Sequence, residues 1–165
     1  MIISCYPGVG KTKLAEMRVD IVDLDSSLFK KDFEHWEELY LKVATALSDQ
    51  GYVVLVSAHE EVRKWLLRNS KEKFGEIFPC AELYDEWVSR LRKRWEEDKT
   101  DENHRSYWRC KLNYYSDIRS IEKDFDRHYD LKDPKASKVI QSKIFDMSYD
   151  LEFIIETILA DMRVL

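Results

Sequence analysis

The sequence predicts an α/β fold in three layers: a mainly parallel five-stranded sheet with helices on both faces. Short apolar runs alternate with stripes of helical period along the chain, and this alternation is typical of parallel sheets. The runs are rich in β-branched residues and lack a polar–apolar alternation, which indicates strands buried on both faces. A length of 165 residues fits one domain with a substantial core.

Each element is expected from its local pattern. We expect strands at residues 1–6, 21–25, 52–58, 76–83 (interrupted by Pro79) and near 138–141. We expect helices at residues 11–17, 36–47, from 59 onward, as a helical hairpin over 84–129, and at 151–162. These elements predict a single domain over residues 1–165, with a core at about 1–83 and 134–165 and a helical lid or insertion at about 84–133.

Composition narrows the classes of protein that remain. A net charge of -5 argues against nucleic-acid binding by bulk electrostatics, although it leaves room for a local basic face. The cysteines Cys5, Cys80 and Cys110 are odd in number and lack C-x-x-C spacing, so neither a disulfide framework nor a zinc site is indicated. The apolar runs are too short to span a bilayer, and no signal peptide is evident. We therefore expect a cytoplasmic protein with no membrane partner.

The string CYPGVGKT at residues 5–12 nearly matches the phosphate-binding loop G-x-x-x-x-G-K-[ST], with Cys5 in place of the first glycine. It follows a predicted strand and opens a predicted helix, as the motif requires. Two alternatives stay open. The string is either such a loop or a plain glycine turn with a surface lysine, and Cys5 is either a tolerated substitution or a reactive thiol.

A phosphate-binding loop works because backbone N–H groups, exposed by glycine geometry, point at phosphate oxygens. Gly8 and Gly10 supply that geometry here. Lys11 is expected on the β- and γ-phosphates of ATP, and the Thr12 hydroxyl is expected on Mg²⁺. The expected ATP-binding residues are Pro7, Gly8, Val9, Gly10, Lys11, Thr12 and Lys13.

With this loop, the sequence resembles the small P-loop kinases of the nucleoside-monophosphate-kinase and shikimate/gluconate-kinase type, and it is especially similar to short members encoded by tailed bacteriophages. The segments that carry the resemblance are PGVGKT (7–12), DLDSS (23–27), VLVSAHEEVR (54–63) and WVSRLRKR (87–94). The resemblance spans roughly residues 1–95 and implies a P-loop NTPase-type sandwich with ATP and Mg²⁺ as ligands. If a phage encodes the chain, its compartment is the host cytoplasm.

The resemblance also implies roles for two aspartates at the end of the second strand. Asp23 and Asp25 stand where such kinases place a pair near the acceptor hydroxyl, and alternate residues of a strand share a face. Asp25 is expected to be the catalytic base because it lies further out at the carboxyl end, and Asp23 to hold Mg²⁺ together with Thr12. Both aspartates are expected to contact the acceptor, and Ser57 stands where many relatives carry a Walker B acid. The alternative for either aspartate is a cap on the next turn.

Four further residues are assigned by resemblance. His59 and Arg63 are four residues apart at the mouth of the predicted site and are expected to contact the acceptor, although a structural histidine is the alternative. Arg90 and Arg94 match the lid position and are expected to cover the charge of the transferred phosphoryl group. The alternative for these arginines is the solvated side of an amphipathic helix, and the segment 95–129 is either a packed hairpin or a surface that stacks bases.

Three functions are compatible with these residues. The leading one is ATP-dependent transfer of the γ-phosphate to a small-molecule acceptor, with a nucleoside or nucleotide favoured. The second is a kinase that acts on nucleic-acid ends or modified bases, against which the acidic balance speaks. The third is a non-catalytic ATP-binding regulator on a kinase scaffold. Cys5, in place of a glycine, and Ser57, in place of a Walker B acid, favour this alternative.

Overall fold

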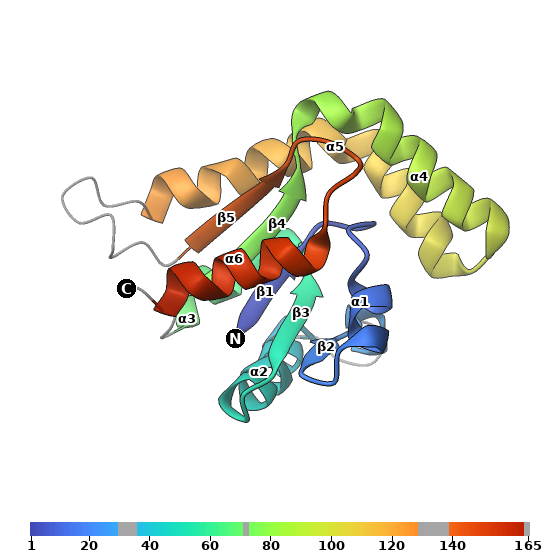
Figure 1. Cartoon of the computed structure of the whole chain (residues 1–165). Helices are drawn as coiled ribbons and strands as arrows, with labels where there is room; N and C mark the ends of the chain where they lie inside the picture. The colour runs from blue at the N-terminus through green and yellow to red at the C-terminus, as the bar shows by residue number, and fades with distance from the viewer. Residues whose placement is uncertain (30–35, 71–72, 129–138, 164–165) are drawn as a thin grey trace.

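A computed structural model describes residues 1–29, 36–70, 73–128 and 139–163. Within these residues five strands form one sheet, in the order β2-β3-β1-β4-β5, and every neighbouring pair is parallel (Figure 1). The prediction of a mainly parallel five-stranded sheet is confirmed. The strands are β1 (Ile2–Cys5), β2 (Ile21–Asp23), β3 (Val53–Ser57), β4 (Phe74–Pro79) and β5 (Val139–Ile144).

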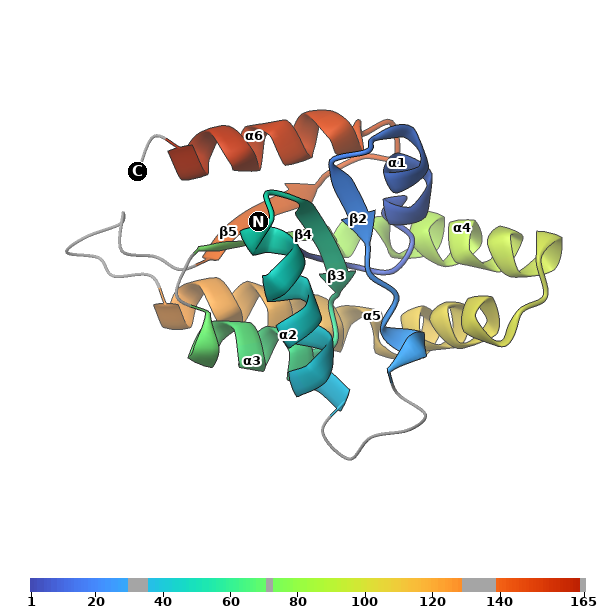
Figure 2. The same cartoon turned by 90° about the horizontal axis from the view of Figure 1, so that it is seen from below.

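Helices cover both faces of the sheet. In Figure 2, α6 and α1 lie on one side of the strands, and α2, α3 and α5 lie on the other. The described helices are α1 (Lys11–Met17), α2 (Trp36–Asp49), α3 (Glu60–Asn69), α4 (Tyr84–Glu97), α5 (Asp101–His128) and α6 (Leu151–Arg163), with short 3-10 turns η1 (Ser26–Leu28) and η2 (Ala81–Leu83).

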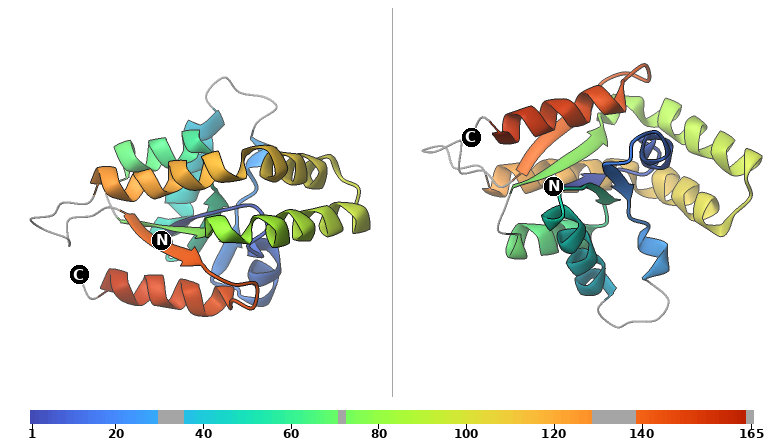
Figure 3. Two further views of the ribbon diagram at one scale, coloured as in Figure 1. Left: turned by 90° about the horizontal axis from the view of Figure 1, so that it is seen from above. Right: turned by 60° about the horizontal axis from the view of Figure 1, so that its bottom comes forward.

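The predicted helical hairpin is formed by α4 and α5. Figure 3 shows α4 running beside the first half of α5, beyond the carboxyl edge of the sheet. The stacked rings of Trp95 and Tyr107, with centroids 5.6 Å apart, join the two helices. The second half of α5 packs against β4 and β5. The hairpin is therefore anchored on the sheet at one end and projects past the predicted site at the other.

Several predicted boundaries differ from the structure. The second strand ends at Asp23, so Asp25 lies beyond it at the start of η1 and does not share a strand face with Asp23. The fourth strand begins at Phe74, before the predicted residue 76. The fourth strand ends at Pro79 and does not reach residue 83, because η2 and then α4 take over directly after it. The fifth strand runs on to Ile144, and the predicted start at Lys138 lies outside the described residues. At the ends of the fourth and fifth strands, the alternation of strand residues was too weak to define an end.

The strand order creates a crevice at the carboxyl edge of the sheet. β1 and β3 are neighbours in the sheet. The chain runs from β1 toward the β2 edge, whereas it runs from β3 toward β4 and the opposite edge. When the connections after two adjacent parallel strands run in opposite directions, a gap opens between the two loops, and ligands of α/β proteins bind in such gaps. The loop after β1 and the residues after β3 meet at this place.

A buried ion network ties α3 to α5 and the sheet, and it contains Arg63. The Arg63 Nε donates to Asp124 Oδ2 (2.7 Å), and the two terminal nitrogens donate to the Ala58 carbonyl (2.8 Å) and the Ser120 hydroxyl (2.7 Å). The Arg63 residue is 2% exposed and lies 3.7 Å from the Glu76 carboxyl. The prediction that Arg63 lies at the mouth of the site and contacts an acceptor is wrong, because each of its nitrogens is used inside the core.

Glu76, on β4, completes the network from the side of the sheet. Burial raises its pKa to about 8, although the Gln141 amide that donates to it (2.7 Å) and the Arg63 charge oppose this rise. The Glu76 carboxyl therefore holds a proton more readily than an exposed carboxyl does, and Asp124 is the acidic side chain closer to the Arg63 guanidinium (2.7 Å). The network thus places two acidic side chains beside the Arg63 guanidinium, and each of its three nitrogens donates a hydrogen bond.

We predict that Arg63→Ala lowers the free energy of unfolding by about 3–5 kcal/mol, because it leaves the buried Asp124 charge without a partner. Urea unfolding followed by circular dichroism measures this loss. Arg68→Ala is the matched control, since Arg68 lies on the same helix, is exposed and donates to the Lys64 backbone oxygen (3.0 Å). Equal losses for the two variants would contradict a special role of the network.

Candidate functional site

The loop between β1 and α1 has the backbone geometry that its glycines imply. Gly8 has a φ of 90° and Gly10 a φ of 101°, a conformation that side chains other than glycine disfavour. A Cβ on Gly8 would also lie 3.0 Å from the Leu91 side chain and 3.2 Å from the Trp87 indole nitrogen. Gly8 is therefore required for two reasons: its backbone has a positive φ, and α4 lies too close to leave room for a side chain.

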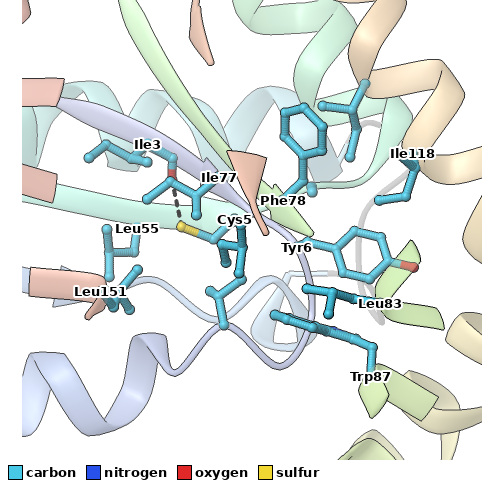
Figure 4. Close-up of a cluster of buried hydrophobic side chains, with 14 of the residues drawn as sticks. Ile3, Cys5, Tyr6, Leu55, Ile77, Phe78, Leu83, Trp87, Ile118 and Leu151 are labelled. Carbon is cyan, nitrogen blue, oxygen red and sulfur yellow. Dashed lines mark hydrogen bonds between the residues drawn. The ribbon is translucent and has the colours of Figure 1, made fainter. Parts of the chain in front are cut away.

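Cys5 is a strand residue and not part of the turn. It ends β1, in register with Ser57 of β3 and Ile77 of β4, and its side chain is 1% exposed in the core (Figure 4). Burial raises the pKa of the Cys5 thiol to about 12, although the nearby Lys11 opposes the rise. A thiol that stays protonated in the core is a poor nucleophile, so the reactive-thiol interpretation is wrong.

Lys11, Thr12 and Asp23 form a compact polar cluster where α1 meets the end of β2. The Lys11 ammonium lies 3.0 Å from Asp23 Oδ1, and the Thr12 hydroxyl donates to Asp23 Oδ2 (2.7 Å). Burial, the largest single effect, lowers the pKa of Lys11, but the Asp23 carboxylate together with Cys5 and Tyr40 opposes it, and the net shift of the pKa is upward. Lys11 is therefore charged, and its ammonium stands at the base of the loop.

Asp25 caps the turn that follows β2. Its carboxylate accepts hydrogen bonds from the Ser27 backbone N–H (2.7 Å) and the Ser27 hydroxyl (2.5 Å) at the start of η1. The capping alternative is therefore correct as a description of its contacts. Asp25 also lines the cavity described next, so the catalytic role expected of it stays a prediction.

One cavity of about 1180 Å³ brings most of the predicted site residues together. It lies between the glycine loop, the carboxyl ends of β2 and β3, and the α4–α5 hairpin. All seven expected ATP-binding residues, together with Asp23, Asp25, His59, Arg90 and Arg94, contribute to its wall, and Arg63 does not. Ser57 also lines it, and the buried Ser57 Oγ has no hydrogen-bond partner among the described residues.

Cations outnumber carboxylates around this cavity, although the whole chain has a net charge of -5. The cationic residues are Lys11, Lys13, Arg90, Lys93, Arg94, Arg105 and Arg109; the acidic ones are Glu16, Asp23, Asp25, Glu97 and Glu102. Within the described parts of the chain, no carboxylate pairs with Lys13, Arg94 or Arg105. Such an excess of cations favours a ligand with several negative charges.

Arg105 and Arg109 were missed by the sequence analysis. They belong to α5 and reach the cavity because the hairpin folds back over the carboxyl edge of the sheet. Arg109 pairs with Asp117 (3.0 Å) and contacts the Nδ1 atom of His59. His59 therefore lies in the cavity wall as expected, held by an arginine from a segment that shows no motif.

A second cavity of about 320 Å³ adjoins the other side of the loop. It shares Val9, Gly10, Lys13 and Arg90 with the first cavity. Its remaining wall is formed by Leu14, Met17, Tyr149, Asp150, Leu151 and Glu152. The second cavity therefore has a mixed wall, with apolar side chains such as Leu14 and Met17 beside charged ones such as Asp150 and Glu152.

A pair of oxygen donors in the first cavity suits a magnesium ion. Mg²⁺ is usually held by one or two carboxylates with phosphate oxygens and water, and the adjacent Thr12 hydroxyl and Asp23 carboxylate supply such donors. The unpartnered Ser57 hydroxyl is a further oxygen at the same edge. Over the residues that the structure describes, no group of three or more His, Cys, Asp or Glu side chains could hold a metal.

Comparison with known proteins does not place the chain in a family. No protein-family model matches it, and no curated protein matches it. One similar solved structure is the crystal structure of an uncharacterized protein from Eubacterium ventriosum ATCC 27560, with 14% identity and a TM-score of 0.43 over 99% of this chain and 97% of that chain. No helix among the described residues is long and apolar enough to cross a membrane.

We predict that Cys5→Gly destabilises the protein and does not repair the loop. Cys5→Ala should cost about 1–2 kcal/mol through lost packing, and glycine a further 0.5–1 kcal/mol through backbone entropy in a strand. Urea unfolding of the three proteins measures both steps. A Cys5→Gly variant as stable as the wild type would show that position 5 needs glycine geometry after all.

Proposed function

We propose that the protein is an ATP-dependent phosphotransferase that moves the γ-phosphate of ATP to a small-molecule acceptor, with a nucleoside or nucleotide favoured. One observation carries this proposal: the glycine loop, the carboxylates Asp23 and Asp25, and arginines of the α4–α5 hairpin line a single cavity. The loop also follows the central strand of a parallel sheet, at the crevice where α/β proteins bind ligands.

The loop residues would hold the triphosphate. The N–H groups of the glycine turn suit phosphate oxygens, and Lys11 is charged and close enough to turn from Asp23 to the β- and γ-phosphates. The Thr12 hydroxyl and the Asp23 carboxylate would hold Mg²⁺. When bound, this ion neutralises part of the negative charge on the phosphates. The second cavity, beside Met17 and Tyr149, would take the base of ATP.

Asp25 would act on the acceptor. Its carboxylate is held in one orientation by Ser27, so it can accept the proton of an acceptor hydroxyl. That hydroxyl oxygen forms a bond to the γ-phosphorus while the bond from the γ-phosphorus to the bridging oxygen breaks, and ADP leaves. Arg90 and Arg94 would stabilise the charge that spreads over the transferred group. Catalysis would then rest on positioning and on charge neutralisation.

A second candidate is transfer to a hydroxyl of a nucleic acid, and three observations favour it. The main cavity of about 1180 Å³ is larger than the typical small-molecule site of about 300–1,000 Å³. Lys13, Arg94 and Arg105, which pair with no carboxylate among the described residues, suit the phosphates of a polymer. Trp108 on α5, outside the cavity wall, is 38% exposed, and a base would stack on the face of its ring away from the Lys111 ammonium.

Lys11→Ala should reduce ATP-dependent phosphorylation by about a hundredfold or more, because the developing charge on the phosphates loses its closest cation. The measurement is transfer of labelled γ-phosphate to a panel of nucleosides and nucleotides, with thermal unfolding to verify the fold. Lys42→Ala is the control, since Lys42 is exposed on α2 and pairs with Glu38 (2.7 Å). Equal phosphorylation by Lys11→Ala and the wild type would refute the proposal.

The salt dependence of binding separates the two candidates. If a nucleic acid is the acceptor, the affinity for a single-stranded oligonucleotide should fall with salt, with a log–log slope of about -2 for three phosphate contacts. Arg94→Ala with Arg105→Ala should then make the slope shallower by about 1.4. If binding is weak and insensitive to salt while free nucleosides or nucleotides are phosphorylated, the small-molecule candidate holds.

A further inference from the structure

Two aromatic side chains from distant segments hold the carbonyl groups of the glycine loop. The Trp87 indole N–H, on α4, donates to the Pro7 carbonyl (2.8 Å). The Tyr149 hydroxyl, just before α6, donates to the Val9 carbonyl (2.9 Å). Trp87 is fully buried and adjoins Tyr6 and Leu83 in the core (Figure 4). The glycine loop is therefore held by hydrogen bonds from α4 and from the segment before α6.

These two bonds orient the N–H groups of the loop. A peptide group is planar and trans, so the carbonyl of one residue and the N–H of the next point in opposite directions. The bond from Trp87 to the Pro7 carbonyl thus sets the direction of the Gly8 N–H, and the bond from Tyr149 to the Val9 carbonyl sets that of the Gly10 N–H. Glycine has more accessible backbone conformations than other residues, so these bonds narrow the orientations that the Gly8 and Gly10 peptide groups can adopt.

Arg90 joins the two rings. The rings of Trp87 and Tyr149 are stacked, with centroids 6.0 Å apart and planes at 19°. The Arg90 guanidinium carbon lies 5.4 Å from the Trp87 centroid and 5.2 Å from the Tyr149 centroid, and its Nη1 donates to the Tyr149 hydroxyl (2.6 Å). Cation–π attraction therefore holds Arg90 beside the loop, whereas Arg94, one turn further along α4, is exposed.

We propose that Trp87 and Tyr149 are positioning residues that preset the peptide groups of the glycine loop for phosphate binding and fix Arg90 at its edge. This inference rests on the proposed function. It assigns the two lid arginines different parts: Arg90 is a fixed cation, and Arg94 is the one free to follow the substrate. Burial raises the pKa of Tyr149, although Arg90 opposes the rise, so the hydroxyl remains a donor at neutral pH.

Tyr149→Phe tests the inference, because it removes the hydroxyl and keeps the ring. Tyr114→Phe is the matched control, since the Tyr114 hydroxyl donates to the Cys80 carbonyl (2.7 Å) and does not line the cavity. The readouts are amide hydrogen exchange of residues 6–13 without ligand, the dissociation constant for Mg·ATP by calorimetry, and the melting temperature. Exchange reports on the loop itself and requires no nucleotide.

Tyr149→Phe should speed exchange in residues 6–13 severalfold and weaken Mg·ATP binding about five- to tenfold. Tyr114→Phe should lower the melting temperature to a similar extent and change neither loop exchange nor affinity. Exchange and affinity of Tyr149→Phe within twofold of the wild type, or equal effects in the control, would overturn the inference. A wild type that binds no Mg·ATP would refute the proposed function, and loop exchange alone would then decide whether Tyr149 holds the loop.

Discussion

The central place of β1 in the sheet determines what the carboxyl edge can do. β1 lies between β3 and β4, and its connection and that of β3 leave in opposite directions. The loop after β1 therefore faces the residues after β3 across a crevice, and Asp23 reaches the same edge from β2 to pair with Lys11 (3.0 Å). The α4–α5 hairpin closes over this edge and adds the cations that the sheet itself lacks. The position of the cavity follows from that order of strands, whereas most of its cations come from the hairpin that covers the edge.

Much of this arrangement could be predicted because it depends on local patterns. Short apolar runs and helical stripes located the strands and most helices, and the glycine motif located the loop. The position of Arg63 could not be predicted correctly from local spacing. Its spacing of four residues from His59 predicts that both lie at the site. However, Val62, Leu66 and Leu67 on the same helix are buried, and this apolar stripe indicates that Arg63 is buried as well. Its partner Asp124 is 61 residues away, and no pattern in one sequence links the two. Arg105 and Arg109 were missed for the same reason, since the fold of the hairpin brings them to the cavity.

The two departures from the phosphate-loop pattern have different meanings. Cys5 completes a strand and fills the core, so the missing glycine does not disable the turn, whose geometry rests on Gly8 and Gly10. Ser57 is different because it faces the cavity with a buried hydroxyl that has no partner among the described residues. A serine there can bind a water molecule but carries no charge, so Asp23 is the carboxylate nearest to Thr12 and would hold the metal (2.7 Å). Of the two residues that favour the non-catalytic alternative, Ser57 therefore supports it more strongly than Cys5.

A crystal structure with Mg²⁺ and a non-hydrolysable ATP analogue tests the central claim most directly. The account predicts that the β- and γ-phosphates lie within hydrogen-bonding distance of Lys11 Nζ and of the N–H groups of residues 8–12. It also predicts that Thr12 and Asp23 hold the metal and that Asp25 and Arg94 face the γ-phosphate. An analogue bound elsewhere, with Lys11 still paired to Asp23, would contradict it.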